Sequence, residues 1–290
     1  MISADCHIHS HHSGDSDASM EDMIGVAMQK GLDTLCFTEH QDFDFPTAYE
    51  PAGFFDLNVP AYLAELQSLQ ETYRGRIELL LGTEIGLQPS CVRENLDFVR
   101  THPFDFVIAS VHVAAGQDPY HKDYWADMRA RAAARLPGAD AETLRQEAER
   151  EGMGFYLAAV LENLQLYEDF DVLGHLDLAN RYFGEGRTAY AHADHAEVID
   201  EILRLLVEKD KGLDCNTNLL WRYGADEMNP TREILARFRE LGGRILTFGT
   251  DAHEAAHVGD ALDTARAIAR SAGFTEYCVF RNRTAEWRPL

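Results

Sequence analysis

Two histidines stand two residues apart near the start of the chain, in the segment Asp5-Cys6-His7-Ile8-His9. The segment begins as an apolar run typical of a strand, and strand side chains point alternately to opposite faces. His7 and His9 therefore share a face, where two neutral imidazoles can chelate one divalent cation. Two unrelated histidines in a solvated tail would explain this segment equally well, so the metal interpretation depends on ligands elsewhere in the chain.

Further imidazoles, carboxylates and an amide stand where other short apolar runs end. Strands are predicted at residues 34–40, 77–84, 104–112, 171–175, 212–218 and 244–253. Their carboxyl-terminal ends carry His40, Glu84, His112, His175, Asn216, Asp251 and His253. Buried polar groups without partners are costly, and metal ions supply partners for such a set.

Helices are predicted between these strands because apolar residues recur there with helical spacing. They cover about residues 20–30, 60–73, 90–99, 154–167, 196–211, 230–241 and 260–272. Strands that alternate with helices predict a parallel sheet with right-handed crossovers. Closure of seven strands into a TIM-like barrel is the simplest arrangement for one domain over residues 1–290, and it gathers the strand ends at one mouth.

Residues 114–152 do not fit this alternation. Two helical segments rich in Ala, Arg and Glu are predicted at 130–135 and 141–150, separated by Pro137-Gly138. We expect a helical insertion after the fourth strand, over one end of the barrel, where it would form a lid or a contact surface.

Composition excludes several classes of protein. The chain has 49 acidic and 26 basic residues, a formal net charge of −23, which argues against a long nucleic acid as partner. The five cysteines are scattered and form no C-x-x-C pair, which predicts neither disulfides nor a thiolate zinc site and favours the cytoplasm. No signal segment or bilayer-spanning run is evident, so no membrane partner is expected. The sequence does not indicate the oligomeric state.

The expected cluster contains about nine nitrogen and oxygen ligands and no sulfur. That number is too large for one tetrahedral zinc and predicts two or three divalent ions of zinc, manganese or iron, bridged by carboxylates. His11 and His12 adjoin this cluster without an assigned role. Histidines predicted in loops or on helices are interpreted as ordinary surface residues: His102, His121, His192, His195 and His257.

The strand-end motifs resemble those of the PHP (polymerase and histidinol phosphatase) superfamily over nearly the whole chain. The matching motifs are Asp5-Cys6-His7-Ile8-His9, Thr38-Glu39-His40, Gly82-Thr83-Glu84, Ser110-Val111-His112, Gly174-His175-Leu176-Asp177 and Thr250-Asp251-Ala252-His253. Asp15-Ser16, residues 172–182 and Asn216-Thr217 are most similar to the histidinol-phosphate phosphatase branch. The resemblance implies a distorted seven-stranded (β/α) barrel with a trinuclear metal centre that hydrolyses a phosphate monoester.

The resemblance also implies which residues bind each ion. One ion would be bound by His7, His9, Glu84 and Asp251. Glu84 would bridge this ion to a second one, which His112 and His175 also bind. A third ion would be bound by Asp15, His40 and His253, and Asp15 stands where many relatives have a histidine.

The function favoured by this resemblance is hydrolysis of L-histidinol phosphate in histidine biosynthesis, by attack of a metal-bridging hydroxide. Glu84 and Asp251 would act as ligands of the reacting ions, and Arg181 and Arg222 are candidates to bind the phosphoryl oxygens. One alternative is a phosphoesterase for another small phosphate or a nucleotide, and another is a non-catalytic metal-binding module. The segment Asn218-Leu219-Leu220-Trp221-Arg222 departs from the phosphatase branch, so the substrate stays open at this point.

Overall fold

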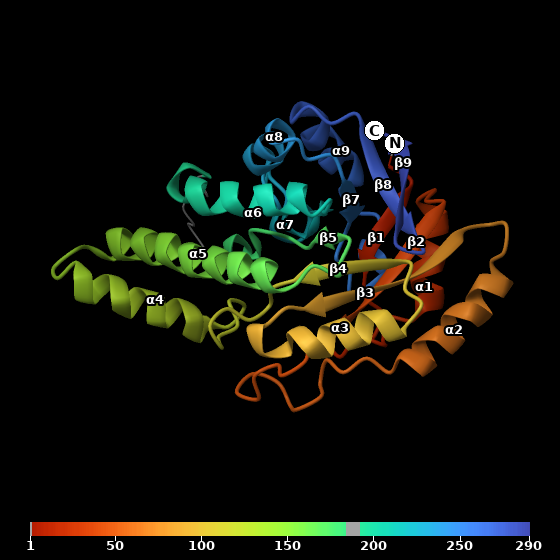
Figure 1. The fold of residues 1–290 in the computed structure, drawn as a ribbon, viewed down its shortest axis with the longest axis horizontal. Coiled ribbons are helices and arrows are strands. Elements are labelled where there is room, and N and C mark those ends of the chain that lie inside the picture. Colours follow the sequence, from red (N-terminus) through yellow and green to blue (C-terminus); the bar gives the residue numbers. More distant parts are fainter. Residues whose placement is uncertain (1, 184–191) are drawn as a thin grey trace.

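In the part of the chain that the computed structural model describes, residues 2–183 and 192–290, seven parallel strands form a sheet in the order β1-β2-β3-β4-β5-β6-β7 (Figure 1). Their bounds are β1 Ala4–Ile8, β2 Thr34–Gln41, β3 Glu78–Gly86, β4 Phe106–Ser110, β5 Val172–Leu173, β6 Gly212–Asn216 and β7 Leu246–Gly249. Consecutive strands are neighbours throughout, which is the connectivity that alternating strands and helices predict.

The sheet closes on itself just beyond the carboxyl ends of β1 and β7. Ile8 pairs with Ala252 in an isolated parallel bridge. Two backbone hydrogen bonds hold the same seam: His9 N–H donates to Ala252 O at 2.9 Å, and Asp251 N–H donates to His7 O at 2.7 Å. The predicted seven-stranded barrel is therefore confirmed, in a nearly closed form whose seam lies at the mouth.

Amphipathic helices cover the outside of the barrel (Figure 1). Their bounds are α1 Met20–Gln29, α2 Val59–Thr72, α3 Val92–Thr101, α6 Ala196–Glu208, α8 Arg232–Glu240 and α9 Leu262–Ser271, with 3-10 turns at Pro89–Cys91, Leu178–Tyr182, His192–His195 and Ala255–His257. Ser19 caps α1 by accepting a hydrogen bond from the backbone of Asp22, as its residue type predicts. The strand predicted at 212–218 was too long, because Asn218 already begins the short helix α7 (Asn218–Tyr223).

A helical hairpin follows β4 and extends away from the barrel, at the left of Figure 1. It consists of α4 (Lys122–Arg135) and α5 (Ala141–Leu166). The sequence predicted separate helices at 141–150 and 154–167, but α5 is continuous, so the expected boundary at residue 152 falls inside it. Gly152 does not end the helix. It allows close packing, because a Cβ there would lie 2.6 Å from the ring of Trp125.

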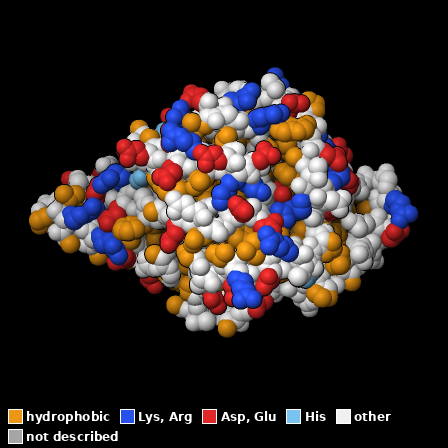
Figure 2. Space-filling view, in the orientation of Figure 1, with side chains coloured by type: hydrophobic (Ala, Val, Ile, Leu, Met, Phe, Trp, Pro, Cys, Tyr) orange, Lys and Arg blue, Asp and Glu red, His pale blue; other side chains and the backbone are white. Residues whose placement is uncertain are grey.

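The outer surface carries charges of both signs. On the face in Figure 2, Lys and Arg side chains are interspersed with Asp and Glu, with hydrophobic atoms between them. Among the described residues, the helices are all too short or too polar to cross a lipid bilayer.

An antiparallel hairpin that the sequence analysis did not predict covers the amino-terminal ends of the strands. It consists of β8 (Glu276–Arg281) and β9 (Thr284–Pro289). Arg283 N–H donates to Asp105 O at 2.9 Å, next to the start of β4. The ring of Phe280 stacks on that of Phe106, with centroids 5.2 Å apart. The hairpin therefore buries the end of the barrel opposite the mouth.

We expect the substitution Phe280→Ala to lower the free energy of unfolding by about 3–5 kcal/mol, because it removes a buried aromatic ring and leaves a cavity against Phe106. Urea denaturation measures this loss. Thr284→Ala, at the exposed start of β9, should change the free energy of unfolding by less than about 0.5 kcal/mol. Equal urea midpoints for Phe280→Ala and the unmodified protein would show that the hairpin does not stabilise the fold.

Candidate metal centre

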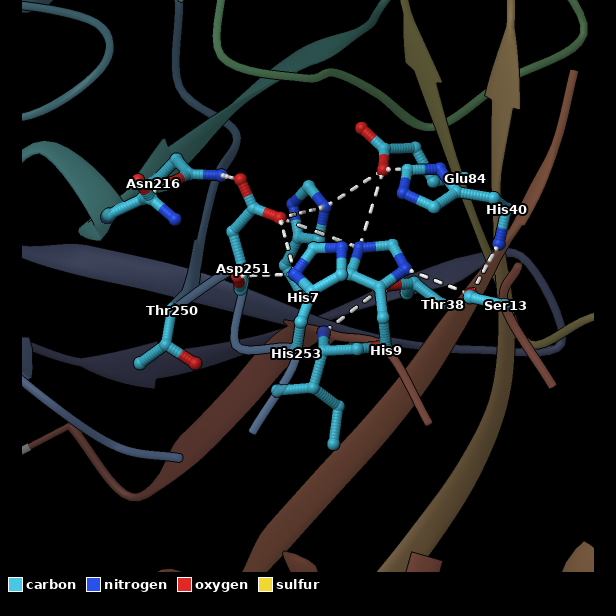
Figure 3. Close-up of polar contacts among 12 residues, drawn as sticks. His7, His9, Ser13, Thr38, His40, Glu84, Asn216, Thr250, Asp251 and His253 are labelled. Carbon is cyan, nitrogen blue, oxygen red and sulfur yellow. Dashed lines mark hydrogen bonds and ion pairs between the residues drawn. The ribbon is translucent and has the colours of Figure 1, made fainter. Parts of the chain in front are cut away.

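The structure brings together the nine side chains that the sequence analysis assigned to a metal cluster. His7, His40 and Glu84 lie on strands, and the others lie in the loops that follow strands. Figure 3 shows His7, His9 and Glu84 pointing toward one another at the carboxyl ends of the strands. The nine residues are His7, His9, Asp15, His40, Glu84, His112, His175, Asp251 and His253.

The carboxylate of Glu84 lies at the centre of this group and is fully buried. Its Oε2 atom lies 3.1 Å from Nε2 of His7 and 3.4 Å from Nε2 of His9. The same oxygen lies 3.3 Å from Nδ1 of His40. Oδ1 of Asp251 approaches the first two imidazoles from the other side, at 3.8 and 3.5 Å. Two carboxylates thus face His7, which lies on β1, and His9, which follows β1 directly.

The other oxygen of Glu84 faces a second pair of histidines. Oε1 lies 2.9 Å from Nε2 of His175 and 3.3 Å from Nε2 of His112. The hydroxyl of Ser110 donates a hydrogen bond to the same atom. Each oxygen of one carboxylate therefore belongs to a different group of nitrogen atoms, which is the arrangement of a bridging ligand.

Outer carboxylates fix the orientation of two imidazoles. Nδ1 of His7 lies 2.8 Å from Oδ2 of Asp214, and Nδ1 of His112 lies 2.7 Å from Oδ1 of Asp42. A neutral imidazole that donates from Nδ1 has a bare lone pair on Nε2. In both residues Nε2 faces Glu84, 3.1 Å from Oε2 for His7 and 3.3 Å from Oε1 for His112, an orientation that suits a metal ligand.

A serine hydroxyl and a backbone carbonyl fix the orientation of two more imidazoles. Ser13 donates its hydroxyl proton to Glu39 at 2.6 Å, so it must accept from Nδ1 of His9, 3.3 Å away. Nδ1 of His253 lies 3.0 Å from the backbone oxygen of Asp251. Their Nε2 atoms are therefore also left with free lone pairs that face the cluster.

Several buried atoms at this point have no hydrogen-bond partner among the described residues. They are Nε2 of His7, Nε2 of His9, Nδ1 of His40, Nδ1 of His175, Oε2 of Glu84 and Oδ2 of Asp42. Lone pairs of imidazoles and carboxylates repel one another unless a cation lies between them. Zinc–ligand bonds of about 2.0–2.1 Å place two tetrahedral ligands about 3.3–3.4 Å apart, close to the separations around Glu84. The donor set fits zinc, manganese or iron.

The charges around these histidines favour a cation in the same place. Burial lowers the pKa of His7, but the carboxylates of Glu84 and Asp214 help to outweigh burial and hold the pKa well above its usual value. Burial likewise lowers the pKa of His112, and Asp42 and Glu84 raise it well above normal. A proton adds positive charge at one nitrogen only, whereas a metal ion places positive charge next to several nitrogen and oxygen ligands at once.

The third group of expected ligands is more open to solvent. Oδ2 of Asp15 lies 3.1 Å from Nε2 of His253 and 3.6 Å from Nε2 of His40. Burial raises the pKa of Asp15, but the two imidazoles lower it below its usual value. His9, His40 and His253 also have ligand atoms within 4.8 Å of one another. Of the three expected ligands of this group, His40 also lies near Glu84, with its Nδ1 atom 3.3 Å from Oε2.

The two arginines singled out by the sequence lie in different environments. Arg181 is buried, and its Nη1 donates to Asp251 at 2.8 Å while its Nε donates to Asn229 at 2.7 Å. Its Nη2 has no partner within the described residues, and the side chain lines the cleft above the cluster. Arg222 is exposed on α7 at the rim of the cleft, with its guanidinium 5.9 Å from the ring of Tyr223.

The cleft above the cluster has a volume of about 1030 Å³. Its floor contains Glu84, and its wall carries Trp221, whose ring stacks on that of His257 at 4.1 Å. His257 and His121, which the sequence analysis interprets as ordinary surface residues, also line this cleft. Acidic residues also line it: Asp15, Asp17, Asp22, Glu50, Asp118, Asp251 and Glu254.

The sequence analysis missed the residues that orient the ligands. Asp214, Asp42, Ser13 and Asn229 each hydrogen-bond a side chain of the cluster or Arg181. A signal was present for Asp214, which precedes Asn216 by two residues on β6 and so shares its face. Asn216 does reach the site, where its Nδ2 donates to Asp251 at 3.2 Å.

The chain is similar to known proteins along nearly its whole length. A family model described as the PHP domain matches residues 5–218. A histidinol-phosphatase from Lactococcus lactis is 33% identical, with 97% of this chain and 95% of the relative covered. A histidinol-phosphatase from Bacillus subtilis is 25% identical, with 91% of this chain and 98% of the relative covered.

Solved structures agree with this relationship. A crystal structure of the L. lactis histidinol phosphate phosphatase, complexed with zinc, L-histidinol and phosphate, has a TM-score of 0.82 over 98% of both chains at 33% identity. A Listeria monocytogenes structure has a TM-score of 0.68 at 18% identity, covering 90% of this chain and 99% of that chain, and shows the shared fold. The chain therefore belongs to the PHP-domain family, in its histidinol-phosphatase branch.

Proposed function

We propose that this protein is a phosphomonoesterase that hydrolyses L-histidinol phosphate to L-histidinol and phosphate with the help of two or three divalent metal ions. The observation that carries this proposal is the group of unpartnered imidazole and carboxylate atoms around Glu84, at the floor of a cleft. The L. lactis relative, solved with zinc, L-histidinol and phosphate, supports both the substrate and zinc as one of the metals.

The ligand groups are those that the family resemblance implies. By distance alone some of these side chains group differently, because His7, Glu84 and His175 form one set of neighbouring ligand atoms and His40, Glu84 and His112 form another. We assign a first ion to His7, His9, Glu84 and Asp251, a second to Glu84, His112 and His175, and a third to Asp15, His40 and His253. When bound, such ions supply a hydroxide nucleophile at neutral pH and neutralise the phosphoryl oxygens. Asp214, Asp42 and Ser13 keep the imidazole lone pairs directed at the cluster, so these side chains would already be oriented before the reaction begins.

Arg181 is the side chain best placed to bind the phosphoryl group. Its Nη1 and Nε are held by Asp251 and Asn229, which fixes the guanidinium of a side chain that lines the cleft and leaves Nη2 without a partner among the described residues. A fixed guanidinium donates to phosphate oxygens with little loss of side-chain freedom. Arg222 lies at the exposed rim, where it would attract the anionic group during binding rather than act on the reacting bonds.

The lining of the cleft also suits the organic part of histidinol phosphate. That part carries an ammonium group and an imidazole ring. Carboxylates such as Asp118 and Glu50 complement the positive charge, and the indole of Trp221 offers a flat apolar surface for a ring. A phosphate ester that lacks a positive charge gains less from these walls, so we expect a preference for cationic monoesters.

The net charge indicates the expected partners, and the cysteines indicate the expected location. With a net charge of −23 the protein repels long polyanions, so we assign it a small phosphorylated substrate and no long nucleic acid. All five cysteines are free and buried. Unpaired cysteines are typical of a reducing compartment, and we place the enzyme in the cytoplasm.

Phosphate release from L-histidinol phosphate tests this function directly. We expect turnover with zinc- or manganese-loaded protein, loss of turnover after chelation, and recovery when the metal is returned, because the cluster around Glu84 requires cations. A panel with mononucleotides, sugar phosphates and a phosphodiester measures selectivity by kcat/KM. Higher kcat/KM for a nucleotide or for the diester than for histidinol phosphate would refute the substrate.

We expect Glu84→Gln to lower kcat by at least about 10³-fold, because a neutral amide cannot bridge two cations and metal catalysis contributes several kcal/mol. Metal analysis of the same sample should show fewer ions per chain. Glu94→Gln, at an exposed position on α3, is the matched control and should keep both metal content and kcat. Near-normal turnover by Glu84→Gln would contradict the bridging role.

We expect Arg181→Lys to lower kcat/KM by about 10²-fold with the metal content retained, because an ammonium cannot keep the contacts to Asp251 and Asn229 and still reach the cleft. Arg222→Lys should lower kcat/KM less than about fivefold, since it keeps an exposed charge at the rim. Steady-state kinetics of both variants measure the difference. Equal losses in the two variants would disprove the separate roles of the arginines.

A further inference from the structure

A second set of ligand-type side chains lies outside the catalytic cleft. His11 and His12 stand in the turn after β1, and Glu65 stands on α2. Oε2 of Glu65 lies 3.0 Å from Nε2 of His12 and 3.3 Å from Nε2 of His11. The two rings lie 4.4 Å apart with an interplanar angle of 32°. Two imidazoles and one carboxylate thus converge on one point.

The spacing of these atoms matches a metal site. Potential ligand atoms of all three residues lie within 4.8 Å of one another. The two distances to Glu65 are close to the separation of about 3.3–3.4 Å that tetrahedral zinc imposes on a pair of its ligands. Two nitrogen donors and one oxygen donor are a suitable set for zinc and related transition ions. His11 and Glu65 are partly exposed, so water has access to the remaining positions.

The turn that carries the two histidines is held in place by a buried carboxylate. Glu39 accepts hydrogen bonds from the backbone and hydroxyl of Ser10 and from the hydroxyl of Ser13. His11 N–H donates to Ala18 O at 2.8 Å across the same loop. Because these contacts constrain the backbone on both sides of the pair, the imidazoles lose little freedom when they bind an ion.

Packing also restricts the second imidazole. The ring of His12 lies 5.4 Å from the ring of Tyr62, which is fully buried on α2. Glu65 follows Tyr62 by three residues and so lies on the same side of the helix. The His12 ring, from the turn, and the Glu65 carboxylate, from α2, are therefore held next to each other.

We infer that His11, His12 and Glu65 form a separate site for one divalent transition ion of the zinc type, distinct from the catalytic cluster. None of the three belongs to the described lining of the cleft. An ion there links the turn after β1 to α2, and the same turn carries Ser13, the hydrogen-bond partner of His9. Its role is to stabilise the turn, and it takes no part in the reaction.

Zinc stoichiometry of the intact enzyme at buffered free zinc tests this site. We expect Glu65→Gln and His12→Asn each to bind one zinc ion fewer per chain than the unmodified enzyme, and to keep its turnover. Excess zinc should raise the melting temperature of the unmodified enzyme more than that of either variant. Glu71→Gln, at an exposed position on the same helix, is the control and should match the unmodified enzyme in all three measurements.

Unchanged zinc stoichiometry in both variants would overturn the inference and leave a hydrogen-bonded group without a metal. Anomalous diffraction at the zinc edge gives an independent reading: a peak between the two imidazoles and Glu65 is expected, and its absence in zinc-soaked crystals would refute the site. Both readings are separate from turnover of histidinol phosphate, so failure of that activity would not decide this question.

Discussion

The polar cluster at the mouth of this barrel is arranged around one buried carboxylate, which lies close to several imidazoles. Among the described residues, Glu84 has nitrogen atoms of His7, His9, His40, His112 and His175 within 3.4 Å of its two oxygens. Burial denies these groups water, and a carboxylate, which only accepts hydrogen bonds, cannot satisfy the lone pairs of the imidazoles. Outward hydrogen bonds to Asp214, Asp42 and Ser13 direct the remaining lone pairs inward. Cations between the ligands would satisfy these lone pairs, which is why the arrangement favours metal chemistry.

Strand register and closure of the sheet produce this convergence. His40 pairs with Glu84 in the parallel register of β2 and β3, so the two side chains emerge at the same level. The seam between β1 and the segment after β7 joins Asp251 N–H to His7 O, which places residues from the two ends of the chain in contact. Gly249 makes this approach feasible, because a Cβ there would lie only 2.1 Å from Cβ of His7.

Stability and chemistry are divided between the two ends of the barrel. The hairpin of β8 and β9 buries the amino-terminal ends of the strands through Phe280 and the backbone contact of Arg283 with Asp105. The carboxyl-terminal ends of the strands and the loops that follow them carry the polar side chains of the cluster. This division is general for parallel barrels, because the loops after the strands can vary without changing the packed opposite face.

The sequence by itself determined the barrel, the positions of the polar strand ends and the family, because period-two spacing and alternation of strands with helices are local signals. It also indicated the nine side chains that the structure brings together, whose individual roles as metal ligands stay a prediction. Tertiary structure alone decided that Arg181 is buried and held by Asn229 while Arg222 is exposed. It also decided that α5 continues through Gly152. The orientation of imidazoles by Asp42 and Asp214, which lie on other parts of the barrel, likewise became evident only in the structure. Asp251, expected on a strand, instead has a left-handed backbone beyond β7 with a φ of 56°. Each of these features depends on contacts between residues far apart in the chain, and neither hydrophobic period nor residue type records such contacts.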